Sequence, residues 1–142
     1  MNRDELQRIA NERIRDATVL LEGSQWSAAY YLVGYAIECA LKSCILHHLN
    51  QTGVLFKDRK YLDRLGKCWT HDFDTLLDLA GLTTLQGRAQ GASPTFRTFW
   101  GVVRDWSETS RYERKTELEA RALYEAVTHE TDGVMQWTRQ HW

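Results

Sequence analysis

The stretch WSAAYYLVGYAIECALKSCIL, Trp26 to Leu46, decides the fold. Its residues are apolar on nearly every helical face, and it lies within a predicted helix over residues 25–49. A helix of this kind is central in its domain and has neighbours on several sides. Gly34 stands in its middle, where glycine costs about 1 kcal/mol relative to alanine. We therefore expect another helix to approach closely at Gly34.

The segment before this helix predicts its first neighbour. From Arg3 to Leu21, apolar residues recur at three- and four-residue steps with charged residues on the other faces, as in an amphipathic helix. Glu22-Gly23-Ser24 then breaks the pattern, with Gly23 as the C-terminal cap and Ser24 as the N-terminal cap of the next helix. A connection this short predicts two adjacent, antiparallel helices.

The rest of the chain also predicts helices, because helical spacing recurs and only one proline is present. In chain order we expect a short helix over residues 58–65, a helix capped by Thr70 and ended by Gly81, a flexible loop over 83–92, a helix from Ser93-Pro94 to Trp106, a loop over 107–112 and a long last helix over 113–137. These segments predict one all-α domain over residues 1–142, an up-and-down four-helix bundle with one or two extra short helices.

Charge and composition exclude several classes of protein. The chain carries 18 Lys and Arg against 19 Asp and Glu, so bulk positive charge does not hold it on a polyanion. Cys39, Cys44 and Cys68 lack metal-ligand spacing and predict a reducing, cytoplasmic environment. The longest apolar stretch, residues 28–37, is shorter than the roughly 20 residues that span a membrane. We expect no membrane association, metal or cofactor.

Glu38 and Lys42 are the only charged residues between Glu22 and Lys57. Their spacing of four residues places them on the same face of the predicted helix. They form either a solvated ion pair along a narrow stripe or a polar floor for a groove or dimer seam, since buried charges need partners.

Arg64 and His71 form a second candidate pair, with six residues between them. Arginine stabilises charge that develops on a phosphate, and histidine moves a proton near neutral pH. Together they suit cleavage of RNA through attack by its 2′-hydroxyl group. The alternative is that His71 caps or packs the start of a helix and that Arg64 is solvated.

The string WSETSRY, Trp106 to Tyr112, places two aromatic rings and Arg111 in one predicted loop. Aromatic faces and a guanidinium group suit nucleotide stacking and phosphate binding. The alternative is that Trp106 and Tyr112 anchor the loop in the core and that Arg111 pairs with a carboxylate.

The ordered set of segments resembles the HEPN domain superfamily. The resemblance rests on AAYYLVGYAIECALK (residues 28–42), THD (70–72) and WSETSRY (106–112), followed by the last long helix. It implies a helical bundle that dimerises. It also implies work beside a nucleotidyltransferase domain or partner, or metal-independent ribonuclease activity in toxin–antitoxin and defence systems.

The ribonuclease members of this superfamily carry an Arg and, after a short spacer, a His that opens the last long helix. After Arg111, the positions at that spacing hold Thr116, Glu117 and Leu118 instead of His. The resemblance therefore implies a member without that catalytic pair, rather than an enzyme.

We expect a cytoplasmic homodimer that binds a nucleotide, RNA or a nucleotidyltransferase partner. Its contact residues are expected to be Trp106, Arg111 and Tyr112, and Glu38 and Lys42 are expected to line the same groove. The alternative is a metal-independent ribonuclease toxin that uses Arg64 and His71 across a dimer. It is the one reading in which the protein is an enzyme.

Overall fold

The computed structural model describes residues 1–142 and contains helices and no strands, so the predicted all-α class is confirmed. The elements, in chain order, are α1 (Arg3–Glu22), α2 (Trp26–Thr52), the 3-10 helix η1 (Val54–Phe56), α3 (Arg59–Leu65), the 3-10 helix η2 (Gly66–Trp69), α4 (Phe73–Leu79), α5 (Thr83–Ala92), α6 (Pro94–Arg104), the 3-10 helix η3 (Glu108–Tyr112), α7 (Glu117–Thr128) and α8 (Val134–Arg139).

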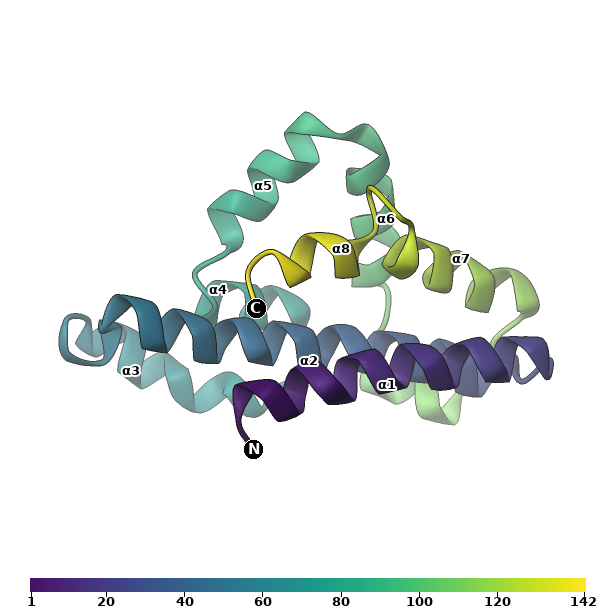
Figure 1. Cartoon of the computed structure of the whole chain (residues 1–142), viewed down its shortest axis with the longest axis horizontal. Coiled ribbons are helices and arrows are strands. Elements are labelled where there is room, and N and C mark those ends of the chain that lie inside the picture. Colours follow the sequence, from purple (N-terminus) through teal and green to yellow (C-terminus); the bar gives the residue numbers. More distant parts are fainter.

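The first two helices run antiparallel and lie side by side, as predicted (Figure 1). Gly23 caps the end of α1, where its N–H donates to the carbonyls of Leu21 and Val19. The expectation that Ser24 caps α2 is wrong. The N-cap of α2 is Gln25, without a side-chain capping bond, and Ser24 instead takes a left-handed φ of 58° in the turn.

α2 is the centre of the molecule, as its composition predicted. It contacts α1, α4, η3, α7 and α8, and its buried apolar residues belong to one core cluster of 31 residues. α2 is also the one helix long and apolar enough to cross a membrane, but 72% of its most apolar window is buried inside the protein. A core helix passes the same test of length and composition.

Three further helices pack on α2, namely α4, α7 and α8. α7 packs on α2 and on α6, and α8 packs on α2 and α7. α5 and α6 rise from this layer as an arch and meet at their tip, away from α1 and α2 (Figure 1).

Position 34 requires glycine because a side chain, not a helix, approaches it closely. The indole ring of Trp106, which follows α6, lies directly on Gly34, and a Cβ atom at this position would come within 2.2 Å of the ring. The predicted close contact is confirmed, whereas its partner is a single tryptophan side chain instead of a helix.

Three predicted segments are wrong, and one of them is the loop expected over residues 107–112, most of which is the 3-10 helix η3. Residues 83–92 form the helix α5 instead of a flexible loop, because good helix formers surround the two glycines and the helix packs on α6. The predicted long last helix is two helices, α7 and α8, separated by a turn. A residue from another part of the chain stabilises that turn, since Ser93 Oγ donates a hydrogen bond to the Asp132 carboxylate at 2.9 Å.

The helix after residue 70 begins later than predicted. Its N-cap is Asp72, whose carboxylate accepts the Thr75 N–H at 2.8 Å, while Thr70 Oγ1 accepts the N–H of Asp72 at 3.1 Å. The helix stops before Gly81, as predicted, and Gly81 has a φ of +70°. His48 lies within 3 Å of where a Cβ of residue 81 would stand. Both the positive φ and this lack of space therefore favour glycine at position 81.

Candidate functional site

A buried charge cluster links α2 to the loop before α4. The Glu38 side chain is only 3% exposed, and its carboxylate accepts hydrogen bonds from Lys42 Nζ at 2.8 Å and from His71 Nδ1 at 2.7 Å. Two partners compensate the carboxylate, as burial of a charge requires. Of the two expected arrangements of Glu38 and Lys42, a fully solvated pair is not observed.

Glu38 fixes the orientation of His71. A carboxylate only accepts hydrogen bonds, so Nδ1 of His71 donates and carries the proton in the neutral imidazole. Nε2 makes no hydrogen bond within the protein, and the side chain is 45% exposed. His71 therefore presents a free nitrogen that accepts a hydrogen bond or a proton from a ligand. His71 does not cap α4, since Asp72 does.

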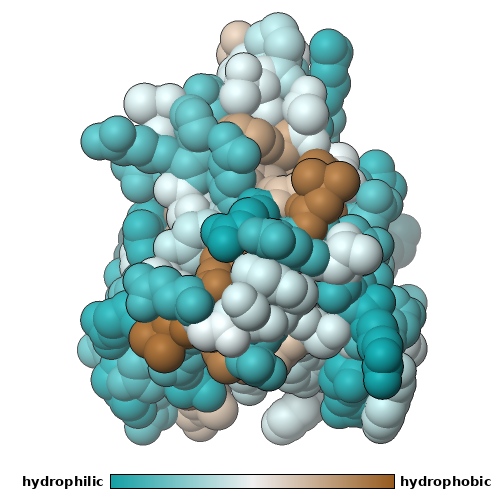
Figure 2. Space-filling view, turned by 90° about the vertical axis from the view of Figure 1, so that its right-hand side faces the viewer, coloured by the Kyte–Doolittle hydropathy of each residue, from teal (hydrophilic) through white to brown (hydrophobic).

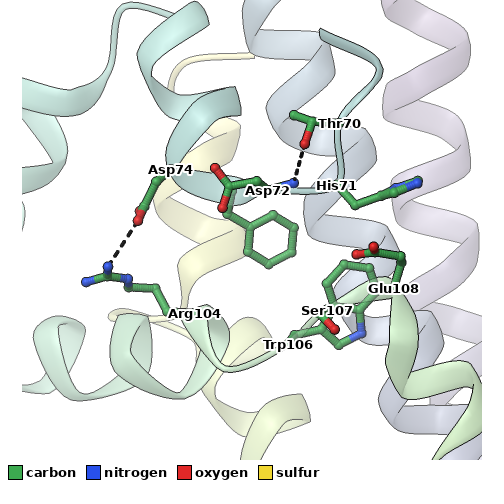
Figure 3. Close-up of a pocket in the computed structure, with 9 residues that line it drawn as sticks. Thr70, His71, Asp72, Asp74, Arg104, Trp106, Ser107 and Glu108 are labelled. Carbon is green, nitrogen blue, oxygen red and sulfur yellow. Dashed lines mark hydrogen bonds and ion pairs between the residues drawn. The ribbon is translucent and has the colours of Figure 1, made fainter. Parts of the chain in front are cut away.

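His71 lines a pocket of about 260 Å³ between the loop before α4 and the loop after α6. Figure 3 shows the pair of Asp74 and Arg104 on one side of this pocket and His71 with Glu108 on the opposite side. Arg104 donates to Asp74 at 3.0 Å. The pocket is lined by Thr70, His71, Asp72, Phe73, Asp74, Arg104, Trp106, Ser107 and Glu108.

The charges and size of this pocket restrict what it holds. Three carboxylates line it against one arginine, and that arginine is already paired. A phosphate group would be repelled by this surplus of negative charge. The volume also lies below the range of about 300–1,000 Å³ typical of ligand pockets. The pocket suits a small hydroxyl-bearing or cationic group rather than a whole nucleotide.

Trp106 forms part of the pocket floor and anchors the following turn. Its ring stacks on Phe73 with centroids 5.3 Å apart and planes inclined by 4°, and the residue is 5% exposed. Trp106 thus packs in the core, which was one of the two alternatives for this residue. It does not offer an open face for stacking.

Arg111 and Tyr112 lie on the surface in η3, outside the lining of the His71 pocket. The guanidinium of Arg111 sits 5.0 Å from the centroid of the Tyr112 ring, and Tyr112 is 80% exposed. Neither side chain makes an ion pair or hydrogen bond within the protein. The alternative in which Tyr112 anchors in the core and Arg111 pairs with a carboxylate is therefore not observed.

The chain around these two residues is fixed to α2. Ser110 is buried, and the N–H of Lys115 donates to Ser27 Oγ at 2.8 Å. Lys115 Nζ lies 4.7 Å from the ring centroid of Tyr30 and pairs with Glu113 at 2.9 Å. The hydrogen bond that Lys115 Nζ donates to the Glu113 carboxylate raises the pKa of Lys115, so this amine stays charged at neutral pH. Arg111 and Tyr112 are thus displayed on an ordered turn.

Arg64 does not share the pocket of His71. It pairs with Asp78 at 3.4 Å and lines a separate hollow of about 280 Å³ with Lys67 and residues of α4. The arginine that does share the pocket is Arg104. Sequence reasoning missed Arg104 and its partner Asp74, because they stand 30 residues apart at the ends of two different helices and no spacing connects them.

Glu38, Lys42 and His71 were singled out in two separate sequence patterns, and the structure joins them in one cluster. Glu38 lies behind His71 and does not itself line the pocket. No group of three or more His, Cys, Asp or Glu side chains is arranged to hold a metal ion. Comparisons with family models, with curated proteins and with solved structures find no match to this chain.

Proposed function

We propose that this chain is a HEPN-like helical module, a four-helix bundle in its frame, that binds RNA or a nucleotide through Arg111 and Tyr112. The observation that carries the proposal is the exposed Tyr112 ring with the unpaired Arg111 guanidinium 5.0 Å from its centroid. A base stacks on an exposed ring, and a guanidinium fork binds a phosphate.

The surroundings of Tyr112 support a negatively charged ligand. Arg114 is exposed and, like Arg111, makes no ion pair. The one carboxylate between them in sequence, Glu113, is already occupied by Lys115. In sequence, two guanidinium groups without an ion pair therefore stand on either side of the exposed Tyr112, in a chain whose total charge is only −1.

The resemblance to the HEPN superfamily supplies the wider setting of the proposal. In this setting the protein is a cytoplasmic homodimer, and it acts in a toxin–antitoxin or defence system. A nucleotidyltransferase-type protein is its partner, and the RNA or nucleotide contact occurs without catalysis.

Calorimetric titration with ATP and with a short RNA tests the proposal. Arg111→Ala is expected to weaken binding by about tenfold, which corresponds to the loss of one charge-assisted contact. Arg97→Ala is a matched control, because Arg97 is also exposed and also makes no ion pair, but lies in α6. Equal binding by wild type and Arg111→Ala would remove the site.

The second candidate is a metal-independent ribonuclease that uses His71 with Arg64 of a dimer. The observation that favours it is the free Nε2 of His71, held in place by Glu38. This reading predicts RNA cleavage in the presence of a chelator and its loss in His71→Ala. RNA that stays intact after long incubation with the pure protein would count against it.

A further inference from the structure

Positive charge is concentrated on one short segment of the chain. Residues 54–69, which form η1, α3 and η2, contain five Lys and Arg against two Asp. The remainder of the chain contains 13 Lys and Arg against 17 Asp and Glu. A protein that is acidic elsewhere thus carries one basic segment, whose field attracts an anionic partner locally.

The same segment exposes two of the three aromatic side chains that the fold leaves open to solvent. Phe56 is 96% exposed and Trp69 is 84% exposed, and Tyr112 is the third. Most other aromatic residues pack in or against the core. Exposed large aromatic rings are costly to leave in water and commonly mark contact sites.

The exposure of these rings does not come from a loose segment. Asp58 caps α3 by accepting the Tyr61 N–H at 3.0 Å. Tyr61 is 3% exposed, and its hydroxyl donates to the carbonyl of Leu79 at 2.7 Å. Tyr61 therefore anchors α3 to α4 through a buried side chain, while Phe56 and Trp69 at the two ends of the segment stay exposed.

Three of the five cations of residues 54–69 make no ion pair or hydrogen bond. Arg64 is engaged by Asp78, and Lys57 donates to the carbonyl of Thr52 at the end of α2. Arg59, Lys60 and Lys67 are exposed and make no ion pair. We define the α3 surface as the exposed residues Phe56, Arg59, Lys60, Lys67 and Trp69.

We propose that the α3 surface binds single-stranded nucleic acid. Bases stack on Trp69 and Phe56, and the cations of Arg59, Lys60 and Lys67 pair with the phosphates between them. Isolated aromatic rings interspersed with Lys and Arg are the arrangement that binds single strands without sequence preference. The inference shares the ligand class of the proposed function but rests on separate residues.

The distribution of apolar groups argues against a membrane as the partner. A helix that lies on a bilayer buries a continuous apolar face. α3 is seven residues long, and the one exposed large apolar residue on it, Leu62, is only 39% exposed. Figure 2 views the end of the molecule that carries the α1–α2 turn, and there too the apolar patches are small and separated by hydrophilic residues.

The test is fluorescence anisotropy with a labelled oligouridylate of about 20 nucleotides, long enough to cover one such surface. Trp69→Ala and Phe56→Ala are each expected to weaken binding at least fivefold, because a stacked base contributes about 1–3 kcal/mol. Leu118→Ala is the matched control, since Leu118 is 80% exposed on α7 and is outside both surfaces. Charge reversal in Lys60→Glu/Lys67→Glu is expected to weaken binding and to flatten its salt dependence.

The outcomes separate this inference from the proposed function. Loss of affinity in Arg111→Ala with none in Trp69→Ala or Lys60→Glu/Lys67→Glu overturns the α3 surface and leaves the proposed site standing. The reverse pattern supports the α3 surface and overturns the Arg111 site. Binding to phosphatidylserine vesicles or to polyglutamate, without binding to the oligouridylate, overturns the α3 surface as a nucleic-acid site.

Discussion

His71 donates its Nδ1 hydrogen to the buried carboxylate of Glu38 at 2.7 Å, across 33 positions of sequence. This bond ties the loop before α4 to the middle of the central helix. It also turns the free nitrogen of His71 outward, next to a pocket whose far wall is the Asp74–Arg104 pair. The orientation of His71 is therefore set by α2, not by its own helix.

The first prediction concerns this bond. In a double-mutant cycle of Glu38→Gln and His71→Ala, we expect a coupling of about 1–2 kcal/mol in the free energy of unfolding, because the acceptor is charged and buried while the donor ring is half exposed. Urea unfolding measures each value. Additive effects of the two substitutions would contradict a native Glu38–His71 bond.

The second prediction concerns the contact between Gly34 and Trp106. Gly34→Ala is expected to lower the free energy of unfolding by about 1–3 kcal/mol, because its Cβ would overlap the indole ring. Gly87→Ala in α5 is the matched control, since a Cβ there meets nothing within 4 Å. We expect the control to be neutral or to stabilise by up to about 1 kcal/mol. A tolerated Gly34→Ala would show that Trp106 lies elsewhere.

The third prediction concerns acid stability. Burial, with a smaller effect of the charge of His47, lowers the pKa of His141 below 6.5. The unfolded chain then binds more protons than the folded chain as the pH falls through 6.5, so stability falls with it. We expect His141→Gln to lose less stability than wild type between about pH 7.5 and pH 5.5 in thermal melts. An identical loss in both proteins would contradict the shift.

The fourth prediction concerns the three thiols. Burial raises the pKa of Cys39 to about 11 and that of Cys44 to about 12, so neither forms a thiolate at neutral pH. Cys68 is only partly buried. Titration of the native protein with Ellman's reagent is expected to give one fast thiol, which Cys68→Ser removes, and two that react only on unfolding. Three equally fast thiols would contradict the burial of α2.

Sequence patterns predicted the fold most accurately where burial decides the structure. The composition of residues 26–46 specified a central helix, and the break at Gly23 specified its antiparallel neighbour. They failed for α5 and for the division between α7 and α8. In α5, the two glycines hid a run of good helix formers that packs on α6. The turn between α7 and α8 is fixed by the contact of Asp132 with Ser93, which is distant in sequence.

The same limit applies to the candidate sites. Glu38 and His71 are each conspicuous by type, but only the packing of the loop before α4 on α2 shows that they are partners. The string Trp106–Tyr112 divides into a buried anchor and an exposed pair, and sequence alone left both arrangements open. Phe56 and Trp69 were missed because an exposed aromatic residue and a core aromatic residue look alike in a sequence.

Ultraviolet cross-linking to a short uridine-rich RNA, mapped by mass spectrometry, tests the central claim most directly. Because the proposed ligand stacks on Tyr112 beside Arg111, we predict an RNA adduct on Tyr112 that is strongly reduced in Arg111→Ala. RNA that binds with unchanged affinity in Arg111→Ala and leaves no adduct on Tyr112 would contradict the claim.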